Sequence, residues 1–240
     1  MWLAIDTSSD EVSVALGEPA TVLAEEHALG KRRHARELLP MIGRVMAVAG
    51  TELAALRGVL VTDGPGSFTG LRIGASVAKA LAHTLHLELW RAPSLLVQAA
   101  GSVADCPERI LAVADALRGE VYAAMYRFPA GRVEVEVRPG IFRPADLLRE
   151  VPRPKVVVGR LKPEIMRVFD GWTADRSVVL VDSGPRAGVL LELLGRAGAL
   201  DRVPEASVGR WEPDYGRPAE AQAIWERKHG RPLRHQNGTD

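Results

Sequence analysis

The stretch Thr62-Asp-Gly-Pro-Gly-Ser-Phe-Thr-Gly-Leu-Arg-Ile-Gly74 follows a short apolar run, Val59-Leu-Val61, and leads into a segment with helical periodicity. The spacing predicts a buried strand at residues 59–61 and a helix over residues 69–86. A strand, a glycine-rich turn and a helix N-terminus aim several backbone N–H groups at one point, which is how proteins hold phosphates. The stretch is therefore a candidate anion-binding loop, and a tight turn that serves only the backbone geometry is the alternative.

A second polar stretch, Asp6-Thr-Ser8, ends the first predicted strand, Leu3-Ala-Ile5. Open α/β sheets bind ligands at the carboxyl ends of their strands, and hydroxyls beside a carboxylate suit a magnesium-bound phosphate. Asp and Ser also favour turns through local hydrogen bonds, so a plain turn remains the alternative. The candidate nucleotide or anion site comprises Asp6, Thr7, Ser8, Gly64, Gly66, Ser67, Thr69 and Gly70.

Around these stretches the chain repeats one pattern of strands and helices. Strands are expected at residues 3–5, 12–16, 21–24, 59–61, 110–114, 120–126, 133–137, 156–158 and 178–181. Helices are expected at residues 35–49, 69–86, 94–101 and 187–198. Because a meander of short strands opens each half, the sequence predicts an α/β protein with two duplicated lobes, residues 1–100 and 101–217. Residues 218–240 turn polar and are expected to form a frayed tail.

Composition narrows the class of protein. The 240 residues are 47% apolar and 25% charged, as in an ordinary globular protein. Because 31 basic and 30 acidic side chains nearly cancel, no global field favours nucleic acid or membrane. A single cysteine, Cys106, excludes an internal disulfide and is expected to be a buried free thiol. We expect a soluble, cytoplasmic protein without a membrane partner, since no apolar run is long enough to span a bilayer.

The predicted helix over residues 69–86 carries small residues at steps of four, namely Gly70, Gly74, Ala78 and Ala82. Such a stripe lets a second helix approach closely, which favours a subunit interface. Packing against the protein's own sheet explains the stripe equally well.

Catalytic and metal-binding patterns are missing from the sequence. His34 precedes a predicted helix, but Leu38 stands where a second imidazole ligand would be needed. The neighbouring cations in Lys31-Arg-Arg-His-Ala-Arg36 also oppose a metal ion. This basic run offers contacts to RNA phosphates, although a solvated surface explains it as well.

Several motifs together resemble the TsaB family, also called YeaZ. They are Ala4-Ile-Asp-Thr-Ser8, His34-Ala-Arg-Glu-Leu-Leu-Pro-Met-Ile42, the glycine-rich stretch from Gly64, Asp115-Ala-Leu-Arg-Gly-Glu-Val-Tyr122 and the closing Pro213-Asp-Tyr-Gly-Arg217. The resemblance implies an actin-like ATPase fold of the Hsp70 and sugar-kinase class (ASKHA). It also implies a non-catalytic scaffold or activator for the transferase TsaD, which adds a threonylcarbamoyl group to the adenosine beside the anticodon of ANN-decoding tRNAs.

The resemblance further implies partners and surfaces. Expected partners are a TsaD-like transferase, a TsaE-like ATPase or a second copy of the chain, with tRNA bound only through the complex. No cofactor or metal of its own is implied, although the assembled complex is associated with ATP or ADP. The implied partner interface comprises Leu38, Ile42, Val45, Gly70, Gly74, Val77, Ala78 and Leu81. Structural or partner contacts are expected at Arg72, Arg118 and Glu120.

Two other classes of function stay open. One is a self-sufficient enzyme, either an actin-like ATPase using Asp6, Thr7 and the glycine-rich loop or a glycoprotease-like peptidase. The other is an RNA-binding module, which rests on the basic run alone. Hydrolysis of ATP by the purified chain marks the ATPase, and salt-sensitive tRNA binding marks the RNA-binding module.

Overall fold

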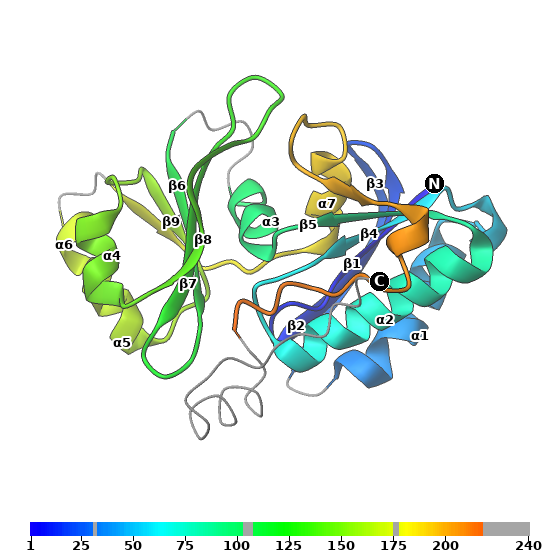
Figure 1. Cartoon of the computed structure of the whole chain (residues 1–240), viewed down its shortest axis with the longest axis horizontal. Coiled ribbons are helices and arrows are strands. Elements are labelled where there is room, and N and C mark those ends of the chain that lie inside the picture. Colours follow the sequence, from blue (N-terminus) through cyan, green and yellow to red (C-terminus); the bar gives the residue numbers. More distant parts are fainter. Residues whose placement is uncertain (31–32, 103–107, 175–177, 218–240) are drawn as a thin grey trace, which may run out of the picture.

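The structure is a computed structural model that describes residues 1–30, 33–102, 108–174 and 178–217. Two lobes, each built on one sheet, lie side by side (Figure 1). Cys106, Lys31, Arg32 and the tail 218–240, for which the sequence analysis made predictions, lie outside the described residues.

The first lobe contains a six-stranded sheet in the order β11-β5-β4-β1-β2-β3. Its strands are β1 (Trp2–Asp6), β2 (Glu11–Glu18), β3 (Thr21–Leu29), β4 (Gly58–Thr62), β5 (Glu88–Ala92) and β11 (Asp201–Val203). Its helices are α1 (His34–Val48), α2 (Phe68–Leu85) and α7 (Ala187–Leu193). β1 and β4 are buried on both faces, because α1 and α2 cover one face of the sheet and α7 covers the other (Figure 1).

The second lobe contains a five-stranded sheet in the order β10-β9-β6-β7-β8. Its strands are β6 (Ile110–Asp115), β7 (Val121–Arg127), β8 (Glu134–Phe142), β9 (Val156–Val158) and β10 (Val179–Val181). The short helices α4 (Pro144–Glu150), α5 (Pro163–Met166) and α6 (Asp170–Thr173) cover its outer face (Figure 1).

The predicted duplication of the lobes is confirmed by the strand pairing. β1, β2 and β3 form an antiparallel meander, and β4 and β5 extend the sheet in parallel with β1. In the second lobe β6, β7 and β8 form the meander, and β9 and β10 extend the sheet in the same parallel manner. β11 adds an antiparallel edge strand to the first sheet alone.

The predicted lobe boundaries need a correction. Residues 187–217 were assigned to the second lobe, but α7 packs against β1, β2 and β3, and β11 pairs with β5. The chain therefore returns to the first lobe after β10. The physical reason is that the inner face of the first sheet needs an apolar cover, which Leu190, Leu191 and Leu193 of α7 provide.

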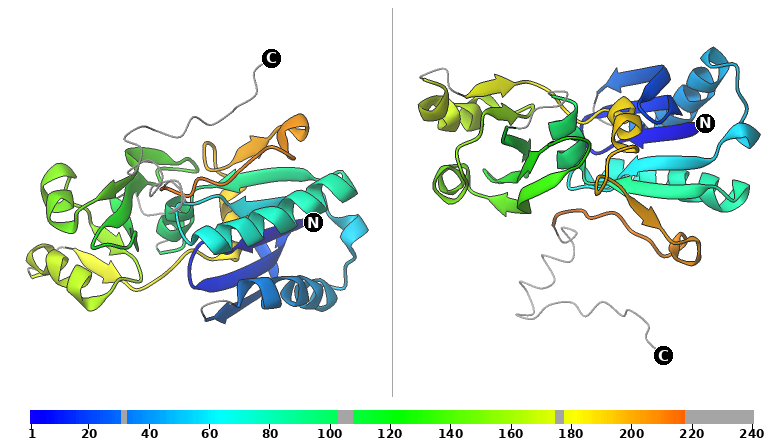
Figure 2. Two further views of the ribbon diagram at one scale, coloured as in Figure 1. Left: turned by 60° about the horizontal axis from the view of Figure 1, so that its bottom comes forward. Right: turned by 90° about the horizontal axis from the view of Figure 1, so that it is seen from above.

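One apolar core spans both lobes. It includes Leu60 of the first sheet, Leu96 of helix α3 (Ser94–Ala100), Leu190 of α7, and Ala112 and Tyr126 of the second sheet. α3 lies between the two sheets (Figure 2). Interfaces between lobes resist relative motion when they are large and apolar, so this core ties the lobes together.

The helices predicted at 35–49 and 69–86 are confirmed within one residue at each end by α1 and α2. The helix predicted at 187–198 ends earlier, at Leu193, and β10 is an edge strand with Val179 49% exposed rather than a buried strand. β5 and β11 were not predicted, because charged residues such as Glu88 and Arg91 interrupt their apolar pattern.

Within the described ranges, none of the helices combines the length and the apolar character that crossing a bilayer requires.

Gln98 on α3 gives the first prediction. Its buried side-chain Nε2 donates to the carbonyl oxygens of Val113 (3.0 Å) and Val158 (2.7 Å), at the ends of β6 and β9. Gln98→Met keeps the length but removes both donors, so the free energy of unfolding should fall by about 2 kcal/mol in urea denaturation. Leu95→Met in the same helix is the control and should cost less than about 1.5 kcal/mol. Equal losses in the two variants would contradict this role for Gln98.

Candidate functional site

The carboxyl ends of β1 and β4 meet at one edge of the first sheet, because the two strands are parallel neighbours. There the Oδ1 atom of Asp6 accepts hydrogen bonds from Thr62 Oγ1 (2.6 Å), Ser8 Oγ (2.7 Å) and Ser8 N (3.3 Å). The structure thus brings the Asp6-Thr-Ser8 stretch together with the glycine-rich stretch. Thr62 is a partner that its position at the start of the quoted stretch did not reveal.

Asp6 is completely buried. Burial disfavours its charged form and raises the pKa of the carboxyl to about 6, although the hydrogen bonds from Thr62 and Ser8 oppose this shift. Asp6 Oδ2 and Thr7 Oγ1 have no hydrogen-bond partner within the described part of the chain. A protonated Asp6 is therefore a substantial fraction of the population near neutral pH.

The glycines of the quoted stretch lie directly against other backbone. A Cβ atom at Gly66 would lie 2.1 Å from the Ser8 carbonyl oxygen, and one at Gly70 would lie 2.0 Å from that of Thr7. At Gly74 it would lie 2.3 Å from Thr7 Oγ1. The glycines therefore permit α2 to pack on the end of β1, which is the structural alternative that the sequence left open.

The N-terminus of α2 is also partly occupied by its own loop. Ser67 caps the helix by accepting a hydrogen bond from Gly70 N (3.2 Å), and the Ser67 N–H donates to the Ser8 carbonyl oxygen (2.7 Å). Thr69 is exposed in the first turn. Anion binding by this loop stays a prediction, since the observed packing accounts for its glycines without a ligand.

Asp63 and Gly64 fix the other side of the loop. The Arg91 guanidinium lies 2.7 Å from the buried Asp63 carboxylate, yet burial still raises the pKa of Asp63 to about 6. Gly64 and Ser94 exchange two hydrogen bonds, one from Gly64 N to Ser94 Oγ and one from Ser94 N to the Gly64 carbonyl. These contacts join the loop to β5 and α3.

Residues 211–217, here called the strap, cross the same loop. Asp214 N donates to the Asp63 carbonyl oxygen at 2.7 Å, and Gly64 has room only for a hydrogen where a Cβ would meet the Asp214 carbonyl. The Tyr215 ring lies 4.5 Å from that of Phe68, and the Arg72 guanidinium lies over both rings. Arg72 therefore has a structural contact within the chain, which was one of its two expected roles.

Glu120 and Arg118 belong to the second lobe. Glu120 forms an ion pair with Arg217 of the strap, and Tyr122 Oη donates to the Tyr215 carbonyl oxygen at 3.3 Å. Glu120 therefore contacts the chain itself. Arg118 is exposed in the turn between β6 and β7, where its φ of 56° and that of Leu117, 64°, are both left-handed.

The residues expected at the partner interface lie mostly inside the lobe. Leu38, Ile42 and Val45 are in the core of the first lobe. Gly70, Gly74 and Ala78 face the protein's own sheet. These six residues are buried, so the expectation that they meet a partner helix is wrong for this conformation. Val77 and Leu81 are half-buried.

The outward face of α1 carries a different set of small and apolar residues. Ala35, Leu39, Gly43 and Ala47 follow at steps of four and are exposed, with Leu39 61% accessible. A Cβ atom at Gly43 would meet no other atom within 4 Å. Amphipathic periodicity contains this face too, as the complement of the buried stripe.

His34 also has a structural contact. Its Nε2 lies 2.9 Å from the Ser9 carbonyl oxygen and the side chain is buried, so the imidazole fixes the β1–β2 turn on α1. Within the described ranges, no three His, Cys, Asp or Glu side chains are grouped closely enough to hold a metal ion.

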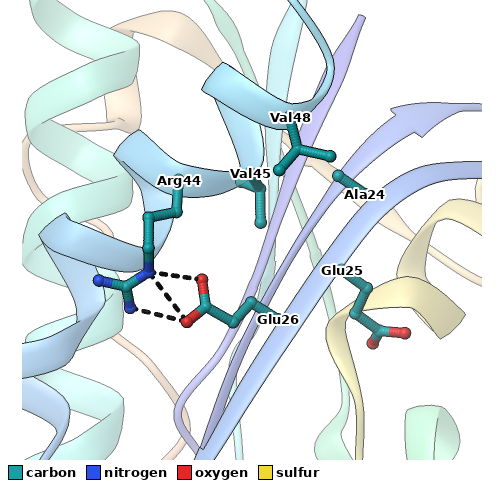
Figure 3. Close-up of a pocket in the computed structure, with 6 residues that line it drawn as sticks. All are labelled: Ala24, Glu25, Glu26, Arg44, Val45 and Val48. Atoms are coloured by element: carbon teal, nitrogen blue, oxygen red, sulfur yellow. Dashed lines mark hydrogen bonds and ion pairs between the residues drawn. The ribbon is translucent and has the colours of Figure 1, made fainter.

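A groove of about 340 Å³ lies between α1 and β3, away from the strand ends (Figure 3). Ala24, Val45 and Val48 form its apolar wall. Arg44 and Glu26 form a two-pronged ion pair across it, with the closest nitrogen and oxygen 2.7 Å apart. Glu25 points away toward α7, where it accepts a hydrogen bond from Gly188 N. The charged groups of the groove thus already have partners.

Comparison with known proteins decides the family. A family model described as "TsaD: tRNA N6-adenosine threonylcarbamoyltransferase" matches residues 22–167, more than half of the chain. The tRNA threonylcarbamoyladenosine biosynthesis protein TsaB of Escherichia coli is 34% identical over 193 residues, covering 79% of this chain and 77% of the relative. TsaB of Bacillus subtilis is 30% identical over 228 residues, covering 93% and 96%. The chain belongs to the TsaB family.

The solved structures agree with this assignment to the TsaB family. YeaZ from Pseudomonas aeruginosa superimposes with a TM-score of 0.69 at 27% identity, covering 89% of this chain and 98% of that one. A second structure from the same organism, described as similar to peptidase YeaZ, gives a TM-score of 0.71. The actin-like fold that the motifs implied is thereby confirmed, in agreement with the two duplicated lobes.

Asp6 gives a prediction about pH. Its pKa of about 6 in the folded protein exceeds its usual value of 3.8, so the folded state binds more protons between these values. Stability should therefore fall as the pH rises from about 4 to about 6, by about 3 kcal/mol for this group. Asp6→Asn mimics the protonated form and should lose less stability than the wild type between pH 4.5 and 7.5 in urea denaturation. Asp10→Asn, at an exposed position, is the control; if Asp6→Asn shows the wild-type slope, Asp6 does not titrate as described.

The glycines give a second prediction. Gly70→Ala places a Cβ against the Thr7 carbonyl oxygen and should lower the free energy of unfolding by about 1–3 kcal/mol. Gly43→Ala, also inside a helix but in open space, should raise it by up to about 1 kcal/mol. Thermal and urea denaturation measure both changes. The same sign for the two substitutions would contradict the packing described for α2.

Proposed function

We propose that this chain is a non-catalytic subunit of the machinery that makes threonylcarbamoyladenosine in tRNA. The TsaB relatives, which are named for this biosynthesis, support the pathway. We further propose that the chain holds a TsaD-like transferase in its working arrangement and helps to recruit a TsaE-like ATPase. ATP or ADP belongs to the assembled complex in this proposal, and tRNA is bound through the complex.

The exposed face of α1 is the observation that carries the proposed contact with the transferase. A glycine inside a helix costs about 1 kcal/mol relative to alanine. Gly43 has no neighbour within 4 Å, so packing within the chain gives no reason for a glycine there. A partner helix that packs closely on Ala35, Leu39, Gly43 and Ala47 supplies the reason, because small residues permit close approach. A second copy of the chain is the proposed occupant of this face when the transferase is absent.

The strand ends support a role without catalysis. Asp6 Oδ1 accepts three hydrogen bonds from within the chain, and the Thr7 and Ser8 carbonyls lie against glycines of the loop. A catalytic carboxylate has to reach its substrate, whereas Asp6 is completely buried. The groups at the usual ligand edge of the sheet therefore maintain the fold.

The test compares Gly43→Arg with Gly43→Ala. An arginine on this face should block close helix packing and abolish co-sedimentation of the chain with the TsaD-like transferase, while the chain stays folded. The alanine variant should retain at least part of the binding. Arg57→Ala, at an exposed position away from α1, is the control and should bind as the wild type does.

The same variants test the pathway in cells that lack the chromosomal copy. The wild type should restore threonylcarbamoyladenosine in bulk tRNA, measured by nucleoside mass spectrometry, and Gly43→Arg should not. If depletion of the protein leaves the nucleoside unchanged, the proposed pathway is wrong. Hydrolysis of ATP by the isolated chain would instead favour the stand-alone ATPase.

A further inference from the structure

Two polar contacts join the lobes where the carboxyl ends of their strands face each other. The first, here called the turn clamp, is the ion pair between Glu11 of β2 and Arg160, which follows β9. The second, the strap clamp, joins the strap to Glu120 and Tyr122 at the start of β7. We propose that these two clamps hold the lobes in one closed arrangement, and that the lobes open when both clamps are broken.

The turn clamp uses a charge that is withdrawn from water. The Glu11 side chain is only 8% exposed, and its Oε2 lies 3.0 Å from Arg160 Nη1. A buried carboxylate depends on its partner far more than an exposed one does, because no water replaces the lost charge. Asp182 lies 3.6 Å from Arg160 Nε and keeps the guanidinium pointed at the β1–β2 turn. Opening the lobes would leave Glu11 without this cation.

The strap clamp reaches the second lobe from the opposite side of the loop. The strap is fixed to the first lobe by Asp214 on Asp63 and by Lys79 Nζ, which donates to the Trp211 carbonyl oxygen at 2.7 Å. Its far end bonds to the second lobe through the Arg217–Glu120 pair. Gly216 has no room for a Cβ between Tyr122 and Pro65, so the strap is held tightly between the lobes.

The apolar core explains why the clamps are needed at this edge. The core surrounds α3 and α7, next to the two places where the chain crosses between the lobes (Figure 2). A rotation about these crossings separates the strand ends while the core stays packed, as in hinge motions of two-lobed proteins. The clamps bridge the strand ends, where the shared core does not hold the lobes.

Distances between spin labels test the proposal on the full chain. Labels at Ala54 in the first lobe and Glu150 in the second are exposed, and Cys106→Ser removes the native thiol. Double electron–electron resonance should give one narrow distance distribution for the otherwise unchanged protein. Glu11→Gln combined with Glu120→Gln should add a second population at longer distance. Glu26→Gln breaks an ion pair within the first lobe and should leave the distribution unchanged.

Two outcomes overturn the proposal. One is a folded Glu11→Gln, Glu120→Gln variant with the distribution of the parent. The other is an equal broadening in Glu26→Gln, which would show that any lost ion pair loosens the protein.

If the double variant fails to fold, hydrogen exchange of the single variants decides. Amides of residues 8–11 should exchange at least about tenfold faster in Glu11→Gln than in Glu26→Gln, because the turn clamp no longer covers them. Reversal of the pair, with Glu11→Arg and Arg160→Glu together, should restore slow exchange. Unchanged rates in Glu11→Gln would contradict the turn clamp. Since neither clamp uses α1, these results do not depend on the proposed function.

Discussion

Backbone packed directly on backbone at the end of β1 is the contact on which the rest of the structure depends. Gly66 and Gly70 let the loop and α2 touch the Ser8 and Thr7 carbonyls, and any side chain there would push the helix off the sheet. With α2 in place, Thr62 reaches Asp6 and the strand ends are closed to water. A dry surrounding strengthens the hydrogen bonds to Asp6 and makes its charged form costly. Local packing and the electrostatics of Asp6 thus have one cause.

The sequence predicted the elements better than it predicted what their faces contact. Apolar residues at helical spacing lie close together in the chain, so α1 and α2 could be located within one residue at each end. The same spacing shows which residues share a face without showing what covers it. On α2 the small stripe with Gly74 faces β1. On α1 the stripe with Leu38 faces the lobe's own core, as amphipathic helices usually do.

Features that depend on distant pairing could not be read from neighbouring residues. β5 and β11 become strands because they pair with strands already in the sheet, although charged residues interrupt their own pattern. α7 belongs to the first lobe because the inner face of that sheet would otherwise be exposed to water. The strap contacts the Asp63 carbonyl through a residue that turn chemistry alone does not connect to it. Propensity describes a segment, whereas tertiary contacts decide its place.

The structure separates the part of the chain that maintains the fold from the part that is free to bind. At the strand ends, the glycine-rich loop, Asp6 and the strap have partners within the chain, so their residue types follow from packing and hydrogen bonding. On α1, Gly43 lowers helix stability without any compensating contact in the chain. A residue that costs stability and has no internal partner calls for an external one. The binding surface is therefore a helix face on the first lobe, away from the edge where sheets of this kind usually hold a ligand.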